Sequence, residues 1–260
     1  MPPHIEFKNV AKHFPTRNQP NASNVVQHLN LQIQKGEVVS VIGPSGCGKS
    51  TLLNMGSGLY LPSEGEVLVE GVRVTGTVRQ VAFMLQKDLL MPWRTIRQNV
   101  ELGMEIDGVR KDKRHQVANA LLKKCHLGGF ENHYPYQLSG GMRQRAALAR
   151  TLAVNPDVLL LDEPFSALDA QTKMVLQQDL AETLWDEKKT ALFITHDLIE
   201  AIALSDRILV MSERPGRIIE EIIVELPHRN NPMQRRRMSE IAPIQGRLME
   251  LLRVGQEDLH

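Results

Sequence analysis

The chain of 260 residues lacks an excess of either charge: 31 Lys and Arg are balanced by 30 Asp and Glu, and the net charge is +1. A protein that coats DNA or RNA usually shows a strong basic excess, so we expect no nucleic-acid partner. No apolar run approaches the ~20 residues that a helix needs to span a bilayer. The N-terminus, MPPHIEFKNVAKHF, is too polar for a signal peptide. These absences predict a soluble protein of the cytosol.

Cysteine is scarce, and Cys47 and Cys125 are the two in the chain. Cys47 lies inside a glycine-rich stretch that a disulfide would block. We therefore expect both to be reduced thiols in a reducing compartment. No Cys/His cluster has the spacing of zinc ligands, which argues against a zinc site.

Short apolar runs that stop abruptly are prominent. They are Glu37–Ile42, which stops at Gly43, Val158–Leu161, which stops at Asp162-Glu163, and Ala191–Ile194, which stops at Thr195-His196-Asp197. Runs of this kind are typical of central parallel strands, whose carboxyl ends meet at one edge of a sheet and form a site there.

The remaining pattern places strands at both ends of the chain and helices in the middle. Strands are predicted at 5–10, 65–74 and, as a β-hairpin, 207–224. Helices are predicted from Lys49 to about Gly58, over 95–128 with a break at Gly108, along the face of Leu176, Leu180 and Leu184, and near 243–254. The middle, roughly 87–155, is thus a helical insert in an α/β core.

One stretch has the pattern of a phosphate-binding loop. The residues Gly43-Pro44-Ser45-Gly46-Cys47-Gly48-Lys49-Ser50-Thr51 match G-x-x-x-x-G-K-[ST] between a predicted strand and a predicted helix. Glycines let backbone N–H groups curl around phosphate oxygens, and the helix adds its positive end. Lys49 can reach the outer phosphates, and the Ser50 hydroxyl can bind Mg²⁺. Alone, the motif predicts an NTPase or a kinase; the alternative is a glycine-rich turn.

Polar side chains after the other runs complete a hydrolytic site. Asp162 is placed to hold Mg²⁺, usually through water. Glu163 points differently and can polarise a water for in-line attack on the γ-phosphate. His196 can reach the γ-phosphate by a hydrogen bond, although a lone histidine is more often structural. Gln86 follows another strand-like run, and alone it indicates nothing.

A second anion-binding pattern lies at 137–145, QLSGGMRQR. Ser139 can cap the helix that follows, and Gly140 and Gly141 leave backbone N–H groups bare, so this helix end favours an anion. The segment lacks a lysine at the phosphate-loop position and an acidic strand of its own. It is therefore not a complete nucleotide site.

The sequence LSGGMRQR resembles the signature motif of ATP-binding cassette (ABC) ATPases. The phosphate loop, Gln86, the signature, the acidic strand, Ser166–Asp169 and His196 follow in that family's order, and the resemblance covers roughly residues 4–226. It implies an α/β fold: a P-loop NTPase (RecA-like) core at 1–86 and 156–226 with an antiparallel β subdomain, and an inserted α-helical subdomain at about 87–155. The cassette would occupy 1–226, followed by a short helical tail at 227–260.

The resemblance also implies that two copies of the chain pack head to tail around ATP and Mg²⁺. Ser139 and Gly141 of one copy would contact the γ-phosphate of ATP bound by the other, and Asp169 would lie at the seam. Glu163 would be the general base, His196 the γ-phosphate sensor, and Gln86 a Mg²⁺ and water ligand that reports to a partner protein. Phe14 falls where the family stacks an aromatic ring, more commonly Tyr, on adenine; the alternative is core packing.

Because the chain lacks a membrane span, a transported solute would need two separate permease subunits, which is the usual arrangement of importers. The stretches LLMPWRTIRQNV (89–100) and SERPGRIIEEI (212–222) resemble the nitrate, sulfonate and taurine importer branch. We therefore expect an importer ATPase, peripheral on the cytoplasmic face of the membrane and served indirectly by a solute-binding protein. The cluster Leu89–Trp93 would form a groove for a permease helix, or else pack in the core.

Two further questions stay open at this level. The run Arg235-Arg236-Arg237 is interpreted as a solvated basic run, with contact to anionic lipid or a permease as the alternative. The competing function is a soluble, non-transport ABC ATPase of cofactor assembly or DNA repair. Repair members place a long coiled coil before the signature, and this chain shows no sustained heptads there.

Overall fold

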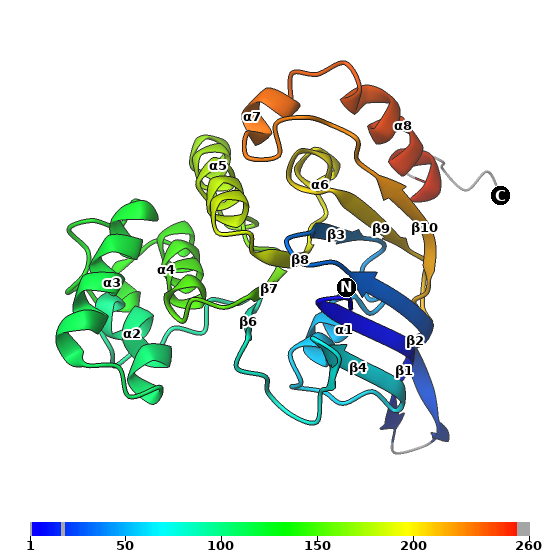
Figure 1. Cartoon of the computed structure of the whole chain (residues 1–260), viewed down its shortest axis with the longest axis horizontal. Coiled ribbons are helices and arrows are strands. Elements are labelled where there is room, and N and C mark those ends of the chain that lie inside the picture. Colours follow the sequence, from blue (N-terminus) through cyan, green and yellow to red (C-terminus); the bar gives the residue numbers. More distant parts are fainter. Residues whose placement is uncertain (1, 17–18, 254–260) are drawn as a thin grey trace.

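The structure, a computed structural model, describes residues 2–16 and 19–253. In this part of the chain, two sheets and a separate group of helices make up the fold (Figure 1). The first sheet has the order β2-β1-β4-β5, with β1 (Ile5–Thr16), β2 (Gln19–Ile33), β4 (Glu64–Val69) and β5 (Val72–Arg73). The second has the order β10-β9-β3-β8-β7-β6, with β3 (Val38–Ile42), β6 (Val81–Met84), β7 (Val158–Asp162), β8 (Thr190–Ile194), β9 (Arg207–Met211) and β10 (Ile218–Ile223).

The second sheet is parallel except for β10, which returns antiparallel to β9. Every residue of β3, β7 and β8 is buried, as expected for strands that are covered on both faces. Ile194 of β8 pairs with Val41 on one side and with Asp162 on the other. The carboxyl ends of these three strands therefore meet at one edge, which confirms the predicted arrangement.

The first sheet is antiparallel and packs on the second through α1 (Lys49–Gly56). Phe7 of β1, Leu53 of α1 and Leu160 of β7 belong to one buried apolar cluster. The helix is thus sandwiched between the sheets, and its first residues point to the edge where the strands end.

A group of helices connects β6 to β7 and lies apart from the sheets (Figure 1). It contains α2 (Ile96–Ile106), α3 (Lys111–Lys124), a short 3₁₀ turn (Pro135–Gln137) and α4 (Gly140–Ala153). Thr95 and Gln98 begin α2 with reciprocal side-chain to backbone hydrogen bonds, a capping box. The group has an apolar core of its own, in which Val100 and Leu122 are fully buried.

The helices α5 (Ala170–Asp186) and α6 (Leu198–Leu204) cover the second sheet, and α7 (Pro232–Arg235) and α8 (Ile241–Leu251) pack outside α6 (Figure 1). The three leucines predicted to line one face of α5 are all buried. Ile202 of α6 and Leu248 of α8 share an apolar cluster. The C-terminal segment is therefore part of the folded body.

Arg235 corrects the interpretation of residues 235–237 as a solvated run. Its side chain is 1% exposed. It donates hydrogen bonds to the carbonyls of Leu226 at 2.7 Å and of Ser205 and Pro227 at 2.9 Å each. The guanidinium thus joins the end of α6, at Ser205, to the segment after β10, at Leu226 and Pro227. Only Arg237 in this run is exposed.

Over residues 2–16 and 19–253, the structure contains no helix that is long and apolar enough to cross a membrane. Cys47 and Cys125 are both free, as predicted, and both are buried. Burial raises the pKa of the Cys125 thiol to about 12, so this thiol is unreactive at neutral pH.

Candidate functional site

Residues 43–48 form a loop between β3 and α1, and together with 49–51, the first residues of α1, they are shaped to hold phosphate. Gly48 has a φ of 109°, and a Cβ there would lie 2.8 Å from Cγ2 of Val26, so the loop requires glycine at this position. The Lys49 ammonium donates to the carbonyls of Gly43 and Pro44 at 2.8 Å each. Together with the N-terminus of α1, this cation gives the loop a positive potential that favours an anion.

A hollow of about 300 Å³ opens in front of the loop. It is lined by Ser45, Gly46, Gly48, Lys49, Ser50 and Thr51 of the loop, and by Val25, Gln86, Asp162, Glu163 and Ile194. The structure thus brings most of the predicted loop residues together with three predicted polar side chains. Cys47 is an exception, because its side chain is buried in the apolar core.

Glu163 lies at the centre of the polar side chains. Its Oε2 accepts a hydrogen bond from Nε2 of Gln86 at 3.1 Å and lies 3.6 Å from Nδ1 of His196. Its φ is 49°, in the left-handed region that a glutamate rarely adopts. Such strain costs of order 1–3 kcal/mol and persists only where the surroundings impose it. The main chain here turns the carboxylate towards the hollow and towards the two side chains predicted to act with it.

Asp162 and Ser50 form the best candidate for a divalent cation site. The Ser50 hydroxyl is hydrogen-bonded to the Asp162 carboxylate, and burial raises the pKa of Asp162 despite that hydrogen bond. A buried carboxylate beside a hydroxyl and the Gln86 amide is a set of hard oxygen donors, and such donors fit Mg²⁺. The described residues contain no cluster of three or more His, Cys, Asp or Glu with metal-ligand geometry, so phosphate oxygens and water would complete the shell.

The residues Ser139, Gly140 and Gly141 stand at the start of α4. Ser139 caps the helix by accepting from the Met142 N–H at 3.3 Å. None of the three lines the hollow in front of the phosphate loop. Asp169 likewise caps α5, accepting from the Thr172 N–H at 2.9 Å, and this hydrogen bond lowers the pKa of Asp169. Within one chain, the two glycine-rich segments therefore do not line the same hollow.

Gln144 is a site residue that sequence reasoning missed. Its buried side-chain amide donates to the Glu163 carbonyl at 2.9 Å, and its amide oxygen accepts from the Ala167 N–H at 2.9 Å. The helix α4 is thereby tied to the segment that follows β7. The sequence shows a glutamine one turn into α4. It does not show which backbone groups that side chain contacts.

Two arginines of α4 were also missed, and both hold the segment after Gln86. Arg143 forms an ion pair with Asp88 at 3.0 Å. Arg150 donates to the carbonyls of Asp88 at 2.6 Å and Leu89 at 2.8 Å. A displacement of this segment would therefore move α4, whose N-cap is Ser139, through these contacts.

Phe14 lies outside the hollow and packs on a different partner. Its ring contacts that of Tyr60 edge-on, with centroids 5.5 Å apart, and Nζ of Lys12 lies 5.1 Å from the Phe14 centroid. The ring is partly exposed. Its predicted contact with adenine stays a prediction, as does the role of each residue in the site.

The cluster Leu89–Trp93 divides between core and surface. Leu90 is buried, whereas Leu89 is 56% exposed and Trp93 is 72% exposed. A tryptophan and a leucine left in water on a segment held by two arginines form a candidate contact surface. We call these two side chains the Leu89/Trp93 surface.

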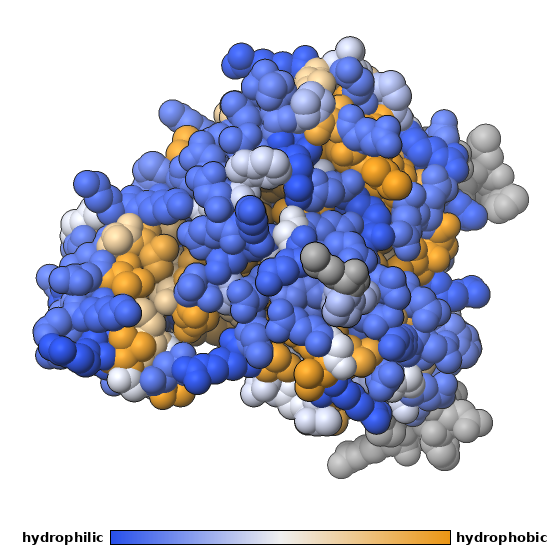
Figure 2. Space-filling view, viewed as in Figure 1, coloured by the Kyte–Doolittle hydropathy of each residue, from blue (hydrophilic) through white to orange (hydrophobic). Residues whose placement is uncertain are grey.

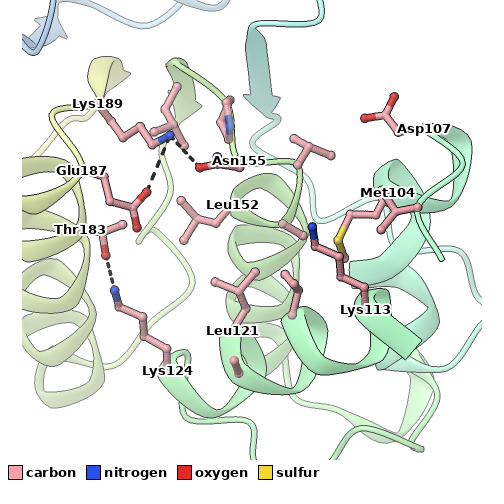
Figure 3. A pocket seen from close by; sticks show the side chains of 17 residues that line it. Met104, Asp107, Lys113, Leu121, Lys124, Leu152, Asn155, Thr183, Glu187 and Lys189 are labelled. Carbon is pink, nitrogen blue, oxygen red and sulfur yellow. Dashed lines mark hydrogen bonds and ion pairs between the residues drawn. The ribbon is translucent and has the colours of Figure 1, made fainter. Parts of the chain in front are cut away.

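A larger hollow, of about 550 Å³, lies where α3 and α4 face the end of α5. Its floor contains Leu121, Leu152 and Leu159, and Figure 2 shows apolar surface over α3 and α4. Lys124 donates to the Thr183 hydroxyl at 2.6 Å, and Lys189 donates to the Asn155 side chain at 2.7 Å (Figure 3). No residue of the phosphate loop and neither Asp162 nor Glu163 lines it, so it is not the site of the chemistry.

Comparison with known proteins gives consistent matches. The family model described as "ABC transporter" matches residues 26–166. The chain is 43% identical to an aliphatic sulfonates import ATP-binding protein, SsuB, of Bacillus cereus, over 86% of this chain and 87% of that protein. It is 44% identical to a taurine import ATP-binding protein, TauB, of Yersinia pestis, over 78% and 80%. A solved ATP-binding cassette, dimeric in a post-hydrolysis state with ADP and phosphate, matches with a TM-score of 0.79 and 34% identity, over 85% of this chain and 99% of that one.

Proposed function

The chain belongs to the ABC transporter family of ATPases, and from this premise we propose that it is the ATP-hydrolysing subunit of an importer. It would drive uptake of a small solute, of the nitrate, sulfonate or taurine kind, through two separate permease subunits at the cytoplasmic face of the membrane. The observation that carries the proposal is the 43–44% identity to ATP-binding proteins of sulfonate and taurine import, over more than three quarters of the chain.

The phosphate loop binds the triphosphate of ATP. Backbone N–H groups of 45–51 surround the phosphate oxygens, and Lys49 exchanges its two carbonyl partners for the outer phosphates. Ser50 and Asp162, with Gln86, would hold Mg²⁺. The bound cation would neutralise charge on the β- and γ-phosphates.

Hydrolysis is assigned to the carboxylate of Glu163. It takes a proton from a water molecule as the water oxygen bonds to the γ-phosphorus, and the bond from that phosphorus to the β-phosphate oxygen breaks. Gln86 holds the carboxylate by the hydrogen bond at 3.1 Å. His196, 3.6 Å from the same oxygen atom, donates to the γ-phosphate and fixes it for in-line attack.

A second copy of the chain completes each site. Ser139 and Gly141 lie outside the hollow of their own chain, and the dimeric cassette that this structure resembles provides the precedent for two-chain assembly. In the proposed dimer each α4 N-terminus caps the γ-phosphate of ATP held by the other copy. ATP therefore closes the dimer, and hydrolysis removes the phosphate that holds it closed.

The Leu89/Trp93 surface is the proposed contact for a permease helix. The surface is apolar, exposed and three to seven residues beyond Gln86. Arg143 and Arg150 fasten the same segment to α4. Closure of the dimer through Ser139 would therefore move the surface, and with it the permease.

The second candidate, a soluble ABC ATPase without a permease, leaves this exposed apolar surface without a function. Affinity purification of the tagged chain from detergent-solubilised membranes of its host separates the two. A co-purified permease and solute-binding protein would support the importer, and ligand screening of the binding protein would name the solute. Recovery of soluble partners alone would overturn it. A Trp93→Ala chain should lose the permease, whereas Trp185→Ala, at the other exposed tryptophan, should retain it.

A further inference from the structure

Close to His196, a group of charged and amide side chains connects α5 and α6. The same group reaches Arg236, at the end of α7 in the C-terminal segment. Lys173 of α5 donates to Oδ2 of Asp197 at 2.8 Å and lies 2.8 Å from Oε2 of Glu200. Asp197 directly follows His196 and begins α6, where its side chain accepts from the Glu200 N–H at 3.0 Å. Lys173 therefore holds both the residue after the histidine and the first turn of the next helix.

Gln177, one turn further along α5, extends the contacts to α7. Its amide donates to Oε2 of Glu200 at 2.9 Å, and its amide oxygen accepts from Nη2 of Arg236 at 2.6 Å. The side chain of Gln177 is 0% exposed, so water cannot replace these partners. Figure 1 shows α7 lying against α5 and α6. We call four of these residues the α5–α6 clamp: Lys173, Gln177, Glu200 and Arg236.

Charge burial suggests what the clamp contributes. Burial raises the pKa of Glu200 even though the Lys173 ammonium opposes the shift. Burial would lower the pKa of Lys173, but the hydrogen bonds to Asp197 and Glu200 outweigh it and the pKa is raised. Buried ion pairs usually add little net stability, because desolvation offsets the attraction. Such pairs can instead fix a geometry, and the groups that Lys173 holds here, Asp197 and Glu200, belong to the segment that follows His196.

The clamp also touches the proposed dimer seam. Asp169 caps α5, and the backbone of Lys173 donates to its carbonyl at 2.9 Å. One turn of rigid helix therefore separates the residue expected at the seam from the lysine that holds the His196 segment. A shift of the start of α5 would therefore move Lys173, and with it the segment that carries His196, through protein contacts alone.

We propose that the α5–α6 clamp positions His196 for ATP hydrolysis and makes that position depend on the C-terminal segment through Arg236. The proposal rests on the role of His196 in the proposed function. The four residues do not touch the reacting atoms and act as positioning residues. A misplacement of about 1 Å in such a group can slow a reaction on the order of 100-fold.

Steady-state ATP hydrolysis by the full chain tests the clamp, at a temperature well below unfolding. Lys173→Met should lower kcat by about 10- to 100-fold, and Arg236→Gln should lower it several-fold. The KM for ATP should stay within about twofold, because the phosphate loop is untouched. Lys173→Arg should restore most of kcat. The matched controls are Lys123→Met and Arg237→Gln, which change exposed residues and should match the wild type.

A double variant separates positioning from general damage. Without Lys173, the carboxylates of Asp197 and Glu200 repel each other, so Lys173→Met with Glu200→Gln should recover part of kcat. If Lys173→Met fails to fold, Arg236→Gln is the deciding variant: a several-fold lower kcat supports the clamp, and a wild-type kcat refutes it.

A His196→Ala variant should lose hydrolysis by about 100-fold or more if the histidine holds the γ-phosphate. If His196→Ala loses hydrolysis while Lys173→Met and Arg236→Gln keep the wild-type kcat, the clamp is refuted and the proposed role of His196 stands. If His196→Ala hydrolyses normally, the role of His196 and the clamp both fall.

Discussion

Replacing Gln144 by leucine would test how α4 holds the catalytic segment. The leucine fills a similar volume but removes the amide that donates to the Glu163 carbonyl and accepts from the Ala167 N–H. The carbonyl keeps one partner, because the Ser166 hydroxyl also donates to it at 3.1 Å. The Ala167 N–H loses its side-chain acceptor.

The expected effect follows from these partners. Each of the two backbone hydrogen bonds of Gln144 contributes about 0.5–1.5 kcal/mol. Ala167 is exposed, so water replaces part of what its N–H loses. We therefore expect Gln144→Leu to lower the free energy of unfolding by about 1–2 kcal/mol. Glu163 would also lose part of the support for its strained φ, so kcat should fall on the order of tenfold.

Urea unfolding at constant m and steady-state hydrolysis measure the two effects on the same samples. Gln116→Leu is the matched control, because Gln116 is an exposed helical glutamine on α3, and it should stay within about 0.5 kcal/mol of the wild type. A Gln144→Leu chain that matched this control in stability and kept full kcat would refute the reasoning about Glu163.

Three further outcomes are expected. Glu163→Gln should bind ATP, dimerise at saturating Mg-ATP and lose hydrolysis; size-exclusion chromatography and phosphate release check this, and a monomer that hydrolyses normally would remove Glu163 from its role. Arg235→Leu should destabilise the chain by about 3 kcal/mol, because four carbonyls lose their donor. Arg237→Leu is the control in the same thermal melts, and equal melting temperatures would contradict the account. Burial raises the pKa of Asp162, so the folded chain binds this proton more tightly than the unfolded chain, and stability should fall as pH rises from acid through the raised pKa. Asp162→Asn lacks this titration. In metal-free, nucleotide-free buffer, its free energy of unfolding should therefore rise relative to that of the wild type between mildly acidic and neutral pH. Parallel plots of the two free energies against pH would exclude the effect.

The sheet edge and the phosphate loop were predictable because their signals are local. The apolar runs at β3, β7 and β8 end at Gly43, Asp162-Glu163 and Thr195, and the structure confirms that these ends meet. The family and its α/β fold were predictable because the ordered motifs are specific. The partners of Gln144 and Arg235 were not predictable, because each serves backbone groups that tertiary packing alone brings near. A run of three arginines has the same pattern whether it is solvated or, as at Arg235, buried.

The left-handed backbone of Glu163 has a consequence for how this sequence can change over generations. Asparagine and glycine adopt a φ near 49° far more readily than glutamate does. If Glu163 is the general base, as proposed, selection for a stable fold and selection for ATP hydrolysis act in opposite directions at this position. On that proposal, Asn or Gly at this position in a relative would mark a protein that binds ATP but no longer hydrolyses it.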